Sequence, residues 1–310
     1  MNLATKWEKT LFSICLILSM VFWVVIIFMT KGIASIFAIP GYLLALFLQS
    51  TLITHLKGNA VQITAGQFPE LHLKVQAACE KLKMDAPIVY LLNGDGAMNA
   101  LATHFLRHHY LVLYSDVIDA FEQNSAPIDF YIGHELGHIQ RKHTLWWPVF
   151  LPLKVLPLLI PAYQRACEFS CDQYGKFCSA STEDGVRGLA LLAAGRTKWK
   201  TLSIANYVAQ VKESGGFWMS LHELTGSYPW LSKRIAVLQG GEEAVKIFPR
   251  RHPLACFLAL FCPALISSAF MPLLALCFLV ILLAIAVPNF EKQRLRAKEA
   301  AQKYETPASE

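Results

Sequence analysis

One five-residue segment has the composition and spacing of a metal site. Residues 134–138 read His-Glu-Leu-Gly-His, and on a helix the four-residue spacing puts His134 and His138 one turn apart on the same face. Both imidazoles can then bind a single zinc ion, with Glu135 beside the metal. The motif predicts a zinc-activated water that Glu135 deprotonates as general base. The alternative is a polar surface helix with two incidental histidines.

A catalytic zinc typically has three protein ligands and an open position for water, so a third ligand must come from elsewhere in the chain. Residues 165–172 read Arg-Ala-Cys-Glu-Phe-Ser-Cys-Asp, a helical segment with Arg165, Glu168 and Asp172 on one side. We expect Glu168 to be the third ligand and Asp172 to accept the free ring N–H of a ligating histidine, with Arg165 beside them. Without a metal, these three side chains would form a surface salt-bridge ladder.

Two nearby residues are rival ligands. Cys171 is three residues from Glu168, but a small buried thiol is the expected role there. His143 lies five residues after His138, whereas the metzincin motif has its third histidine six residues after the second. Neither residue replaces Glu168 in the prediction.

Two glycines, Gly133 and Gly137, also lie one turn apart on the motif helix. Each costs about 1 kcal/mol relative to alanine inside a helix. A glycine strip beside the histidines predicts that another backbone approaches closely there.

The composition indicates an integral membrane protein. Of the 310 residues, 55% are hydrophobic and 16% are charged, whereas soluble domains carry about 25% charged residues. The apolar residues gather in four blocks, 11–29, 33–54, 145–163 and 253–288. The net charge of +6 comes from basic residues beside these blocks and not from a basic stripe with interleaved aromatics, so we expect no nucleic-acid partner. The eight cysteines include no C-x-x-C pair, which favours a reduced compartment.

The apolar blocks and turn signals divide the chain into four parts. We expect an N-terminal transmembrane hairpin over residues 1–54, a zinc-binding domain over 55–252, a C-terminal transmembrane or re-entrant hairpin over 253–288, and a charged tail over 289–310. The second helix of the first hairpin should be kinked near Pro40. Block 145–163 is interrupted by prolines. It should lie at the membrane interface, or dip into the membrane and return to the same side.

The fold class predicted for the zinc domain is mainly helical with a small β-sheet. The apolar spacing predicts helices over Phe68–Lys83 and from Pro127 to Lys142, strands over Ile88–Leu92 and Tyr110–Tyr114, and an edge strand over Met98–Thr103.

The pairing of His134-Glu-Leu-Gly-His138 with Arg165-x-x-Glu168-x-x-x-Asp172 resembles the gluzincin integral-membrane zinc metallopeptidases of the HtpX heat-shock protease and CAAX prenyl protease type. Two further segments extend the resemblance. Residues 99–103, Asn-Ala-Leu-Ala-Thr, are similar to that family's Asn-Ala-Phe-Ala segment, and residues 227–235, Ser-Tyr-Pro-Trp-Leu-Ser-Lys-Arg-Ile, to its Ser-His-Pro-x-x-x-x-Arg-Ile segment.

This resemblance implies an endopeptidase with one Zn²⁺ per chain that cleaves membrane or membrane-associated proteins. Asn99 and Ala100 become a candidate substrate strand, since an edge strand can pair with an extended peptide; the alternative is an ordinary strand edge. Tyr228 stands where the family usually has histidine and is a candidate oxyanion stabiliser, the alternative being a packing turn before a helix anchored by Arg234. Many HtpX-like members have two spans between the zinc motif and the glutamate, whereas block 145–163 has too few apolar residues for two.

Basic residues near both ends of the chain place the zinc domain on the cytoplasmic side by the positive-inside rule. A different class remains open, a non-catalytic membrane scaffold or transporter with a structural zinc site. No Asp, Glu, Lys or Arg occurs in Leu11–Met29 or Pro253–Pro288, which disfavours a transporter. Substrate identity and oligomeric state are not encoded in any motif of the sequence.

Overall fold

The structure is a computed structural model, and it describes residues 3–36, 38–94, 100–121 and 126–262. The chain divides into two compact units, Met1–Ala264 and Leu265–Glu310, and all of the described residues belong to the first. The predicted C-terminal hairpin from residue 263 onward, the charged tail and Asn99 therefore lie outside the described residues. The described part is mainly helical with one small sheet, which confirms the predicted class of the zinc domain.

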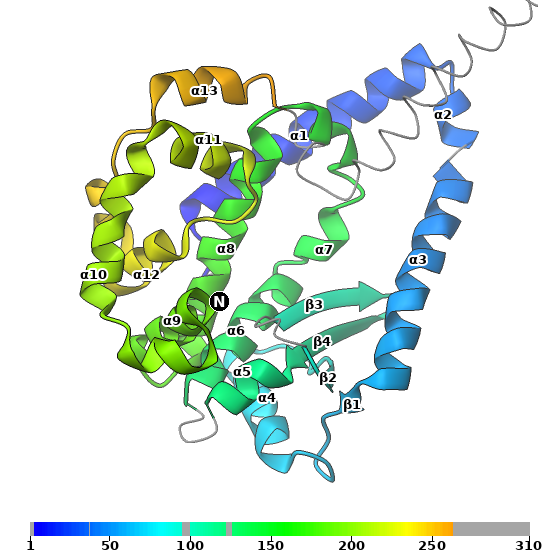
Figure 1. The fold of residues 1–310 in the computed structure, drawn as a ribbon. Helices are drawn as coiled ribbons and strands as arrows, with labels where there is room; N and C mark the ends of the chain where they lie inside the picture. The colour runs from blue at the N-terminus through cyan, green and yellow to red at the C-terminus, as the bar shows by residue number, and fades with distance from the viewer. Residues whose placement is uncertain (1–2, 37, 95–99, 122–125, 263–310) are drawn as a thin grey trace, which may run out of the picture. The chain divides into compact units, whose positions relative to one another are not determined.

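The first two apolar blocks form long helices joined by a tight turn. Helix α1 (Lys6–Met29) ends at Thr30, and positive φ angles of 49° at Lys31 and 84° at Gly32 turn the chain into α2 (Ile33–Ile36) and α3 (Ala38–Asn59). Pro40 lies in the first turn of α3, where its missing N–H removes no helical hydrogen bond, so the second block is two helices and not one helix kinked at that proline. Helices α1 and α3 diverge from α2 (Figure 1). Both are long and apolar enough to cross a membrane.

The sheet has four strands in the order β1-β2-β4-β3. Its strands are β1 (Val61–Gln62), β2 (Ile88–Leu92), β3 (Ala100–Phe105) and β4 (His108–Tyr114). Strands β2 and β4 pair in parallel, with Tyr90 opposite Val112, while β3 pairs with β4 antiparallel through a short turn. Strand β3 is consequently at an edge of the sheet. Helix α4 (Pro69–Leu82) precedes β2, and helix α5 (Ser115–Ala120) follows β4.

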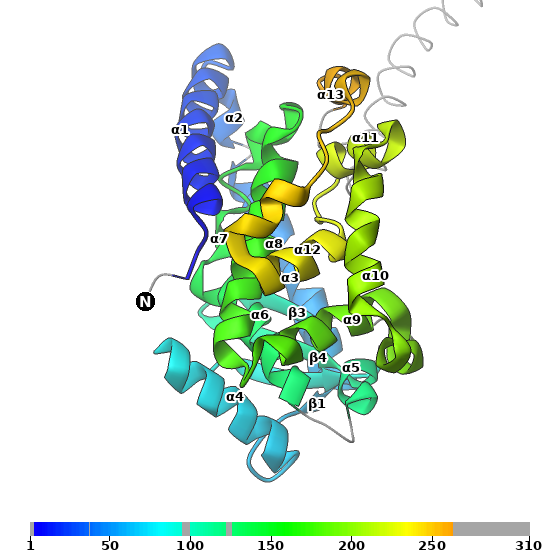
Figure 2. The same cartoon turned by 90° about the vertical axis from the view of Figure 1, so that its left-hand side faces the viewer.

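Two helices at the centre of the unit pack against each other over most of their length. These are α6 (Ala126–Gln140), which carries the His-Glu-Leu-Gly-His segment, and α8 (Leu159–Cys178). Helices α9 (Thr182–Lys198) and α12 (Leu231–Gly240) pack beside them around a cluster of buried side chains that includes Phe130, Leu189 and Ile235. Figure 2 shows α6 between the sheet and α8.

Block 145–163 is not a continuous helix. The chain forms α7 (His143–Trp146), a 3₁₀ helix η1 (Leu151–Val155) and the first turn of α8, with prolines at 148, 152 and 157 between or within these pieces. The segment packs on α1, where Phe12 meets Phe150 and the Ser19 hydroxyl and the Trp23 indole N–H both donate to the carbonyl of Val149. The prolines thus interrupt this block, as its sequence predicts.

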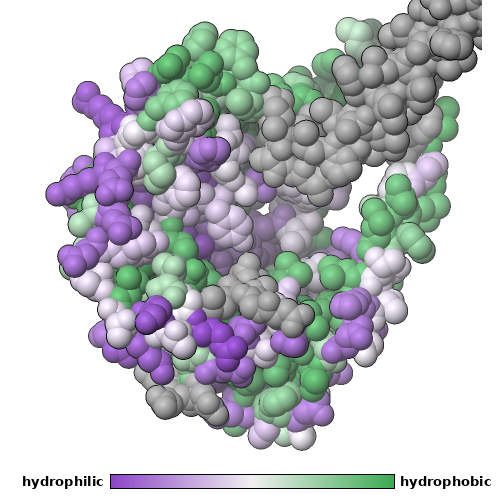
Figure 3. Space-filling view, in the orientation of Figure 1, coloured by the Kyte–Doolittle hydropathy of each residue, from purple (hydrophilic) through white to green (hydrophobic). Residues whose placement is uncertain are grey.

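Exposed apolar side chains gather on α1, α3 and α13 (Pro253–Ala259). The C-terminal end of α1 lies with α2 and α13 at the end of the unit opposite to the sheet (Figures 1 and 2). Figure 3 shows hydrophobic surface over α13 and the outer part of α3. Among these exposed side chains are Val24, Phe28 and Met29 on α1, Tyr42, Leu43 and Phe47 on α3, and Leu254, Phe257 and Leu258 on α13.

Candidate active site

The predicted ligands His134, His138 and Glu168 converge where α6 crosses α8. Their ligand atoms all lie within 4.8 Å of one another. The Nε2 atom of His134 is 3.5 Å from one carboxylate oxygen of Glu168, and Nε2 of His138 is 3.5 Å from the other. A tetrahedral zinc ion with bonds of about 2.0–2.1 Å holds its ligand atoms about 3.3 Å apart. The spacing therefore fits one zinc ion among these three side chains.

The glycine strip of α6 is what allows the two helices to come this close. A Cβ atom on Gly133 would lie 2.6 Å from Cβ of Cys178, and one on Gly137 would lie 3.0 Å from Cβ of Tyr174. A contact of 2.6 Å does not occur in real proteins and one of 3.0 Å is rare, so a larger residue at Gly133 would push α8 away and one at Gly137 would require Tyr174 to shift. The close approach inferred from these glycines in the sequence is present in the structure.

Asp172 and Arg234 contact the predicted ligands and help to orient them. Nδ1 of His134 is 3.0 Å from Oδ1 of Asp172, which leaves Nε2 of that histidine facing Glu168. Arg234 on α12 donates to both oxygens of Asp172 and lies 3.2 Å from Oε2 of Glu168. From the sequence, the expected role of Arg234 is that of a helix anchor. The sequence signal for a role of Arg234 in the site is its position in the segment 227–235, which resembles a family motif.

Arg165 does not reach the two carboxylates. Its guanidinium donates to the backbone carbonyls of Glu223 at 2.6 Å, Leu224 at 3.2 Å and Gly226 at 2.5 Å, at the end of α11 (Phe217–Thr225). Helical spacing put Arg165 on the side of Glu168 but did not determine where a long side chain points. The supporting position expected for Arg165 is occupied by Arg234 instead.

Glu135 is buried next to the ligand cluster and beside the edge strand. Burial is the main cause that raises the pKa of its carboxyl to about 7, and the carboxylate accepts a hydrogen bond from the backbone N–H of Ala102 in β3. A base with this pKa can take a proton from a metal-bound water near neutral pH. The adjacent candidate substrate strand begins at Ala100, the first residue of β3.

Without a metal, the cluster pairs ionised carboxylates with a protonated His134, and zinc binding would displace the proton from that imidazole. Burial opposes ionisation of Glu168, but its hydrogen bond to His134 and the Arg234 charge lower its pKa to about 2. Burial likewise opposes the charge on His134, yet hydrogen bonds to Asp172 and Glu168 raise its pKa to about 9, while burial lowers that of His138 to about 3. Two imidazoles and an ionised carboxylate match the ligand preference of zinc.

The rival ligands lie on the other side of His138. Nδ1 of His143 is 3.0 Å from Nδ1 of His138, and Sγ of Cys171 is 3.8 Å from the same His143 nitrogen. These three could group around a metal, but they would use the His138 nitrogen that faces away from Glu168. Burial also raises the pKa of the Cys171 thiol well above its ordinary value, which disfavours the ligating thiolate.

Tyr228 precedes α12 and its side chain is 57% exposed. The negative charge of Glu168, followed by burial, raises the pKa of its phenol, which therefore stays protonated at neutral pH. The structure thus brings a hydrogen-bond donor into the electrostatic range of both Glu168 and Glu135.

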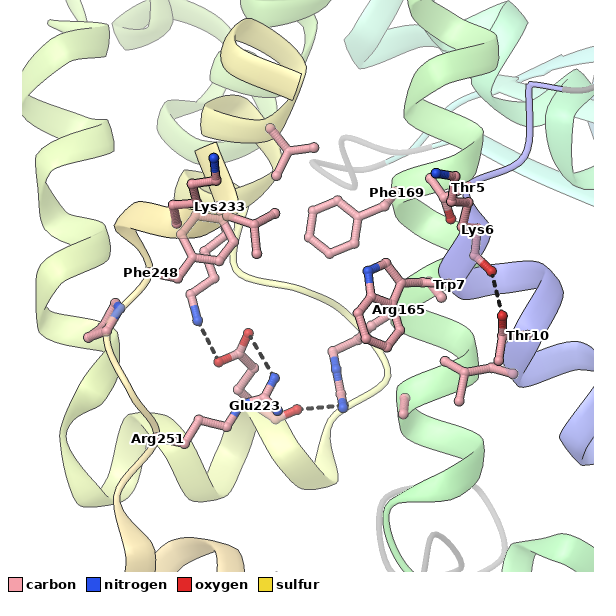
Figure 4. A pocket seen from close by; sticks show the side chains of 17 residues that line it. Thr5, Lys6, Trp7, Thr10, Arg165, Phe169, Glu223, Lys233, Phe248 and Arg251 are labelled. Atoms are coloured by element: carbon pink, nitrogen blue, oxygen red, sulfur yellow. Dashed lines mark hydrogen bonds and ion pairs between the residues drawn. The ribbon is translucent and has the colours of Figure 1, made fainter. Parts of the chain in front are cut away.

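A separate groove with a volume of about 1010 Å³ is lined by residues of α1, α8 and α12. Arg165 and Phe169 line it, together with Trp7 from α1. Glu223 stands between Lys233, at 2.7 Å, and Arg251, at 3.8 Å (Figure 4). None of the three ligand residues is part of its lining, so the groove is distinct from the candidate metal site.

Residues 65–147 match peptidase family M48. The chain is also 22% identical over 179 residues to the plastoglobule-localized metallopeptidase 48, chloroplastic, of Arabidopsis thaliana, an alignment that covers 51% of this chain and 52% of that protein. The chain thus spans about half the length of the curated relative it matches. No solved structure matches. The family match includes the His-Glu-Leu-Gly-His segment, and together the two similarities support the prediction of a metalloprotease, a zinc-dependent hydrolase.

Proposed function

We propose that the protein is a membrane-bound zinc endopeptidase that hydrolyses peptide bonds of membrane or membrane-associated proteins. The observation that carries this proposal is the convergence of His134, His138 and Glu168 within 4.8 Å, with Glu135 buried beside them. The HtpX and CAAX protease types share this ligand pattern, and either type fits the proposal.

His134, His138 and Glu168 would hold the zinc ion. When bound, zinc polarises the scissile carbonyl and lowers the pKa of a bound water toward about 7. Glu135 takes the proton of the attacking water and passes it to the leaving amine nitrogen. The hydroxyl of Tyr228 donates a hydrogen bond to the oxygen that becomes negative in the transition state.

The edge strand supplies a surface for an extended substrate. Strand β3 has one side unpaired within the described sheet, and Ala102 of this strand contacts Glu135. A peptide that added a strand at Asn99 and Ala100 would run past the general base with its backbone extended.

The exposed apolar helices support a location in the membrane. Most of α1 and α3 is exposed although both helices are apolar, and α13 adds further apolar surface at the same end of the unit as the end of α1 (Figures 1 and 3). Exposed apolar surface of this extent marks contact with a membrane or a partner. The charge distribution favours a cytoplasmic position for the zinc domain.

A scaffold with a structural zinc site is the competing function. Structural zinc sites usually close the coordination sphere with four protein ligands, whereas a catalytic site has three and an open position. The cluster of His134, His138 and Glu168 offers three, and the neighbouring acid, Glu135, fits a general base. These features favour the enzyme.

The decisive experiment compares wild type with Glu135→Gln by zinc content and by cleavage of an unfolded protein such as casein. The variant should keep about one zinc per chain and lose at least about 10²-fold in rate, because only the proton acceptor is removed. Glu183→Gln, an exposed carboxylate on α9, is the matched control and should cleave like wild type. A zinc-loaded wild type without peptidase activity would favour the scaffold.

A further inference from the structure

Glu8 is a carboxylate in the first turn of the apolar helix α1, yet none of its surface is exposed. Thr5 caps this helix and accepts a hydrogen bond from the backbone N–H of Glu8, so Thr5 and Glu8 occupy the two positions of a capping box. In that motif the acidic side chain accepts from the N-cap backbone N–H. Here the N–H of Thr5 donates to the hydroxyl of Ser170 at 3.0 Å. The Glu8 carboxylate is therefore available to other partners.

Those partners lead to the metal site. Oε1 of Glu8 accepts a hydrogen bond from Nε of Arg141 at 2.8 Å and lies 3.2 Å from Nε2 of His143. The other nitrogen of His143, Nδ1, lies 3.0 Å from Nδ1 of His138. A continuous chain of contacts thus runs from α1 through His143 to a predicted zinc ligand.

The positions of the protons in this chain follow from the ligand role of His138. If Nε2 of His138 binds zinc, the proton of the neutral ring is on Nδ1, which donates to Nδ1 of His143. His143 then carries its own proton on Nε2, which donates to Glu8. The opposite arrangement would put a proton on Nε2 of His138 and block the metal. A carboxylate at the far end favours the arrangement that allows zinc binding.

We propose that Glu8 and His143 are positioning residues that hold His138 in the orientation and tautomer required to bind zinc through Nε2. Ligating histidines commonly donate their second N–H to a carboxylate. His134 has such a carboxylate in direct contact, Asp172, whereas His138 reaches one only through His143. The inference rests on the proposed zinc site and gives α1 a role in that site besides membrane attachment.

A structural role for the same residues must be separated from this one. Glu8 also pairs with Arg141, and this ion pair alone could fix α1 to α6. Arg141→Gln removes the cation that pairs with Glu8 and leaves His143 unchanged. Ser19→Ala removes another buried polar contact of α1, the hydrogen bond to Val149, and is the matched control for weakened helix packing.

The test measures zinc affinity of the full chain by competition with a chromophoric chelator. Glu8→Gln and His143→Ala should each weaken zinc binding about 10-fold, the lower end of the range for residues that orient metal ligands. Because Glu8 acts through His143, the double variant should bind no more weakly than His143→Ala. Arg141→Gln and Ser19→Ala should stay within about 2-fold of wild type, since neither touches His143. His143→Asn, whose side-chain oxygen can accept from His138, should bind more tightly than His143→Ala.

A second readout is the visible absorption of the cobalt-substituted protein, which reports the geometry of the bound metal. Its bands should shift in Glu8→Gln and His143→Ala but not in Ser19→Ala. Unchanged zinc affinity and cobalt bands in Glu8→Gln, or additive losses in the double variant, would overturn the relay. If wild type itself binds no zinc, the proposed zinc site fails and the relay with it; if wild type binds zinc and Glu8→Gln binds equally well, only the relay fails.

Discussion

Arg234 donates two hydrogen bonds to Asp172, from Nε to Oδ2 at 2.9 Å and from Nη2 to Oδ1 at 2.6 Å. The same guanidinium lies 3.2 Å from Oε2 of Glu168, and all three side chains are buried. One cation from α12 thus faces two carboxylates on α8, and its charge helps to keep the pKa of both below the ordinary value. Helix α12 therefore contributes to the site although it carries none of the predicted ligands.

Replacing Arg234 should destabilise the protein as well as the site. Arg234→Ala leaves two buried carboxylates without their cation, and removing one partner of a buried ion pair costs about 3–5 kcal/mol. Arg234→Lys keeps the charge but loses the paired hydrogen bonds, so it should be intermediate. Arg187→Ala breaks an exposed ion pair with Glu183 and should cost no more than about 1 kcal/mol. Thermal unfolding measures all three; equal effects of Arg234→Ala and Arg187→Ala would contradict the assignment.

Zinc retention distinguishes Glu168 from Cys171 as the third ligand. Glu168→Ala removes the carboxylate that lies 3.5 Å from Nε2 of both His134 and His138, so zinc content at neutral pH should fall steeply. Cys171→Ser should retain about one zinc per chain, because the thiol lies on the side away from Glu168. Metal analysis after dialysis reports both values. Full zinc retention in Glu168→Ala would redirect the search to Cys171.

Tyr228 can be tested through its hydroxyl alone. Tyr228→Phe keeps the ring and removes the proposed donor to the oxyanion, which should lower kcat by about 10²- to 10³-fold, the cost of losing one such donor. KM and zinc content should change little, since the hydrogen bond forms in the transition state. Steady-state kinetics on a peptide substrate give kcat and KM separately. A Tyr228→Phe variant with wild-type kcat would assign the oxyanion to other donors.

Local patterns predicted the parts of the fold that depend on a single element. The strand Ile88–Leu92 has the predicted bounds, and the helix predicted over Phe68–Lys83 begins and ends within one residue of α4. Helical spacing likewise predicts His134 and His138 on one face of α6, whereas Glu168 joins them from α8 through the packing of the two helices. Arg234 and Glu8 reach the site from α12 and α1 through packing that no local period encodes.

The glycine strip of α6 gives a prediction for stability. Gly133→Ala gains up to about 1 kcal/mol of helix propensity. Its Cβ would lie 2.6 Å from Cβ of Cys178 and 2.9 Å from the backbone oxygen of Tyr174, and overpacking of this kind costs about 1–3 kcal/mol. The net effect should be a lower unfolding temperature together with weaker zinc binding, because α8 carries Glu168. Gly58→Ala on α3, where a Cβ meets nothing within 4 Å, should be neutral or stabilising. A Gly133→Ala protein as stable as Gly58→Ala would show that the helices can separate freely.

The proposed zinc site also gives a prediction for the membrane topology. His138 and Glu168 must both lie about 2 Å from one ion, so the 29 residues between them cannot cross the bilayer an odd number of times. Two crossings are excluded because block 145–163, with 19 residues, is barely one span of about 20 and is broken into short helices.

If every block crosses the membrane an even number of times, the N-terminus, the zinc domain and the tail lie on one side. The basic residues Lys6, Lys9, Arg294 and Arg296 predict that this side is the cytoplasm. Single cysteines at Lys6, Ser181 and Ser309 in sealed vesicles should therefore all react with an impermeant thiol reagent from the cytoplasmic face. Labelling of Ser181→Cys from the face opposite to Lys6→Cys would contradict the topology. Ser309→Cys alone on the far side would mean that block 253–288 crosses once, and the zinc domain would still face the cytoplasm.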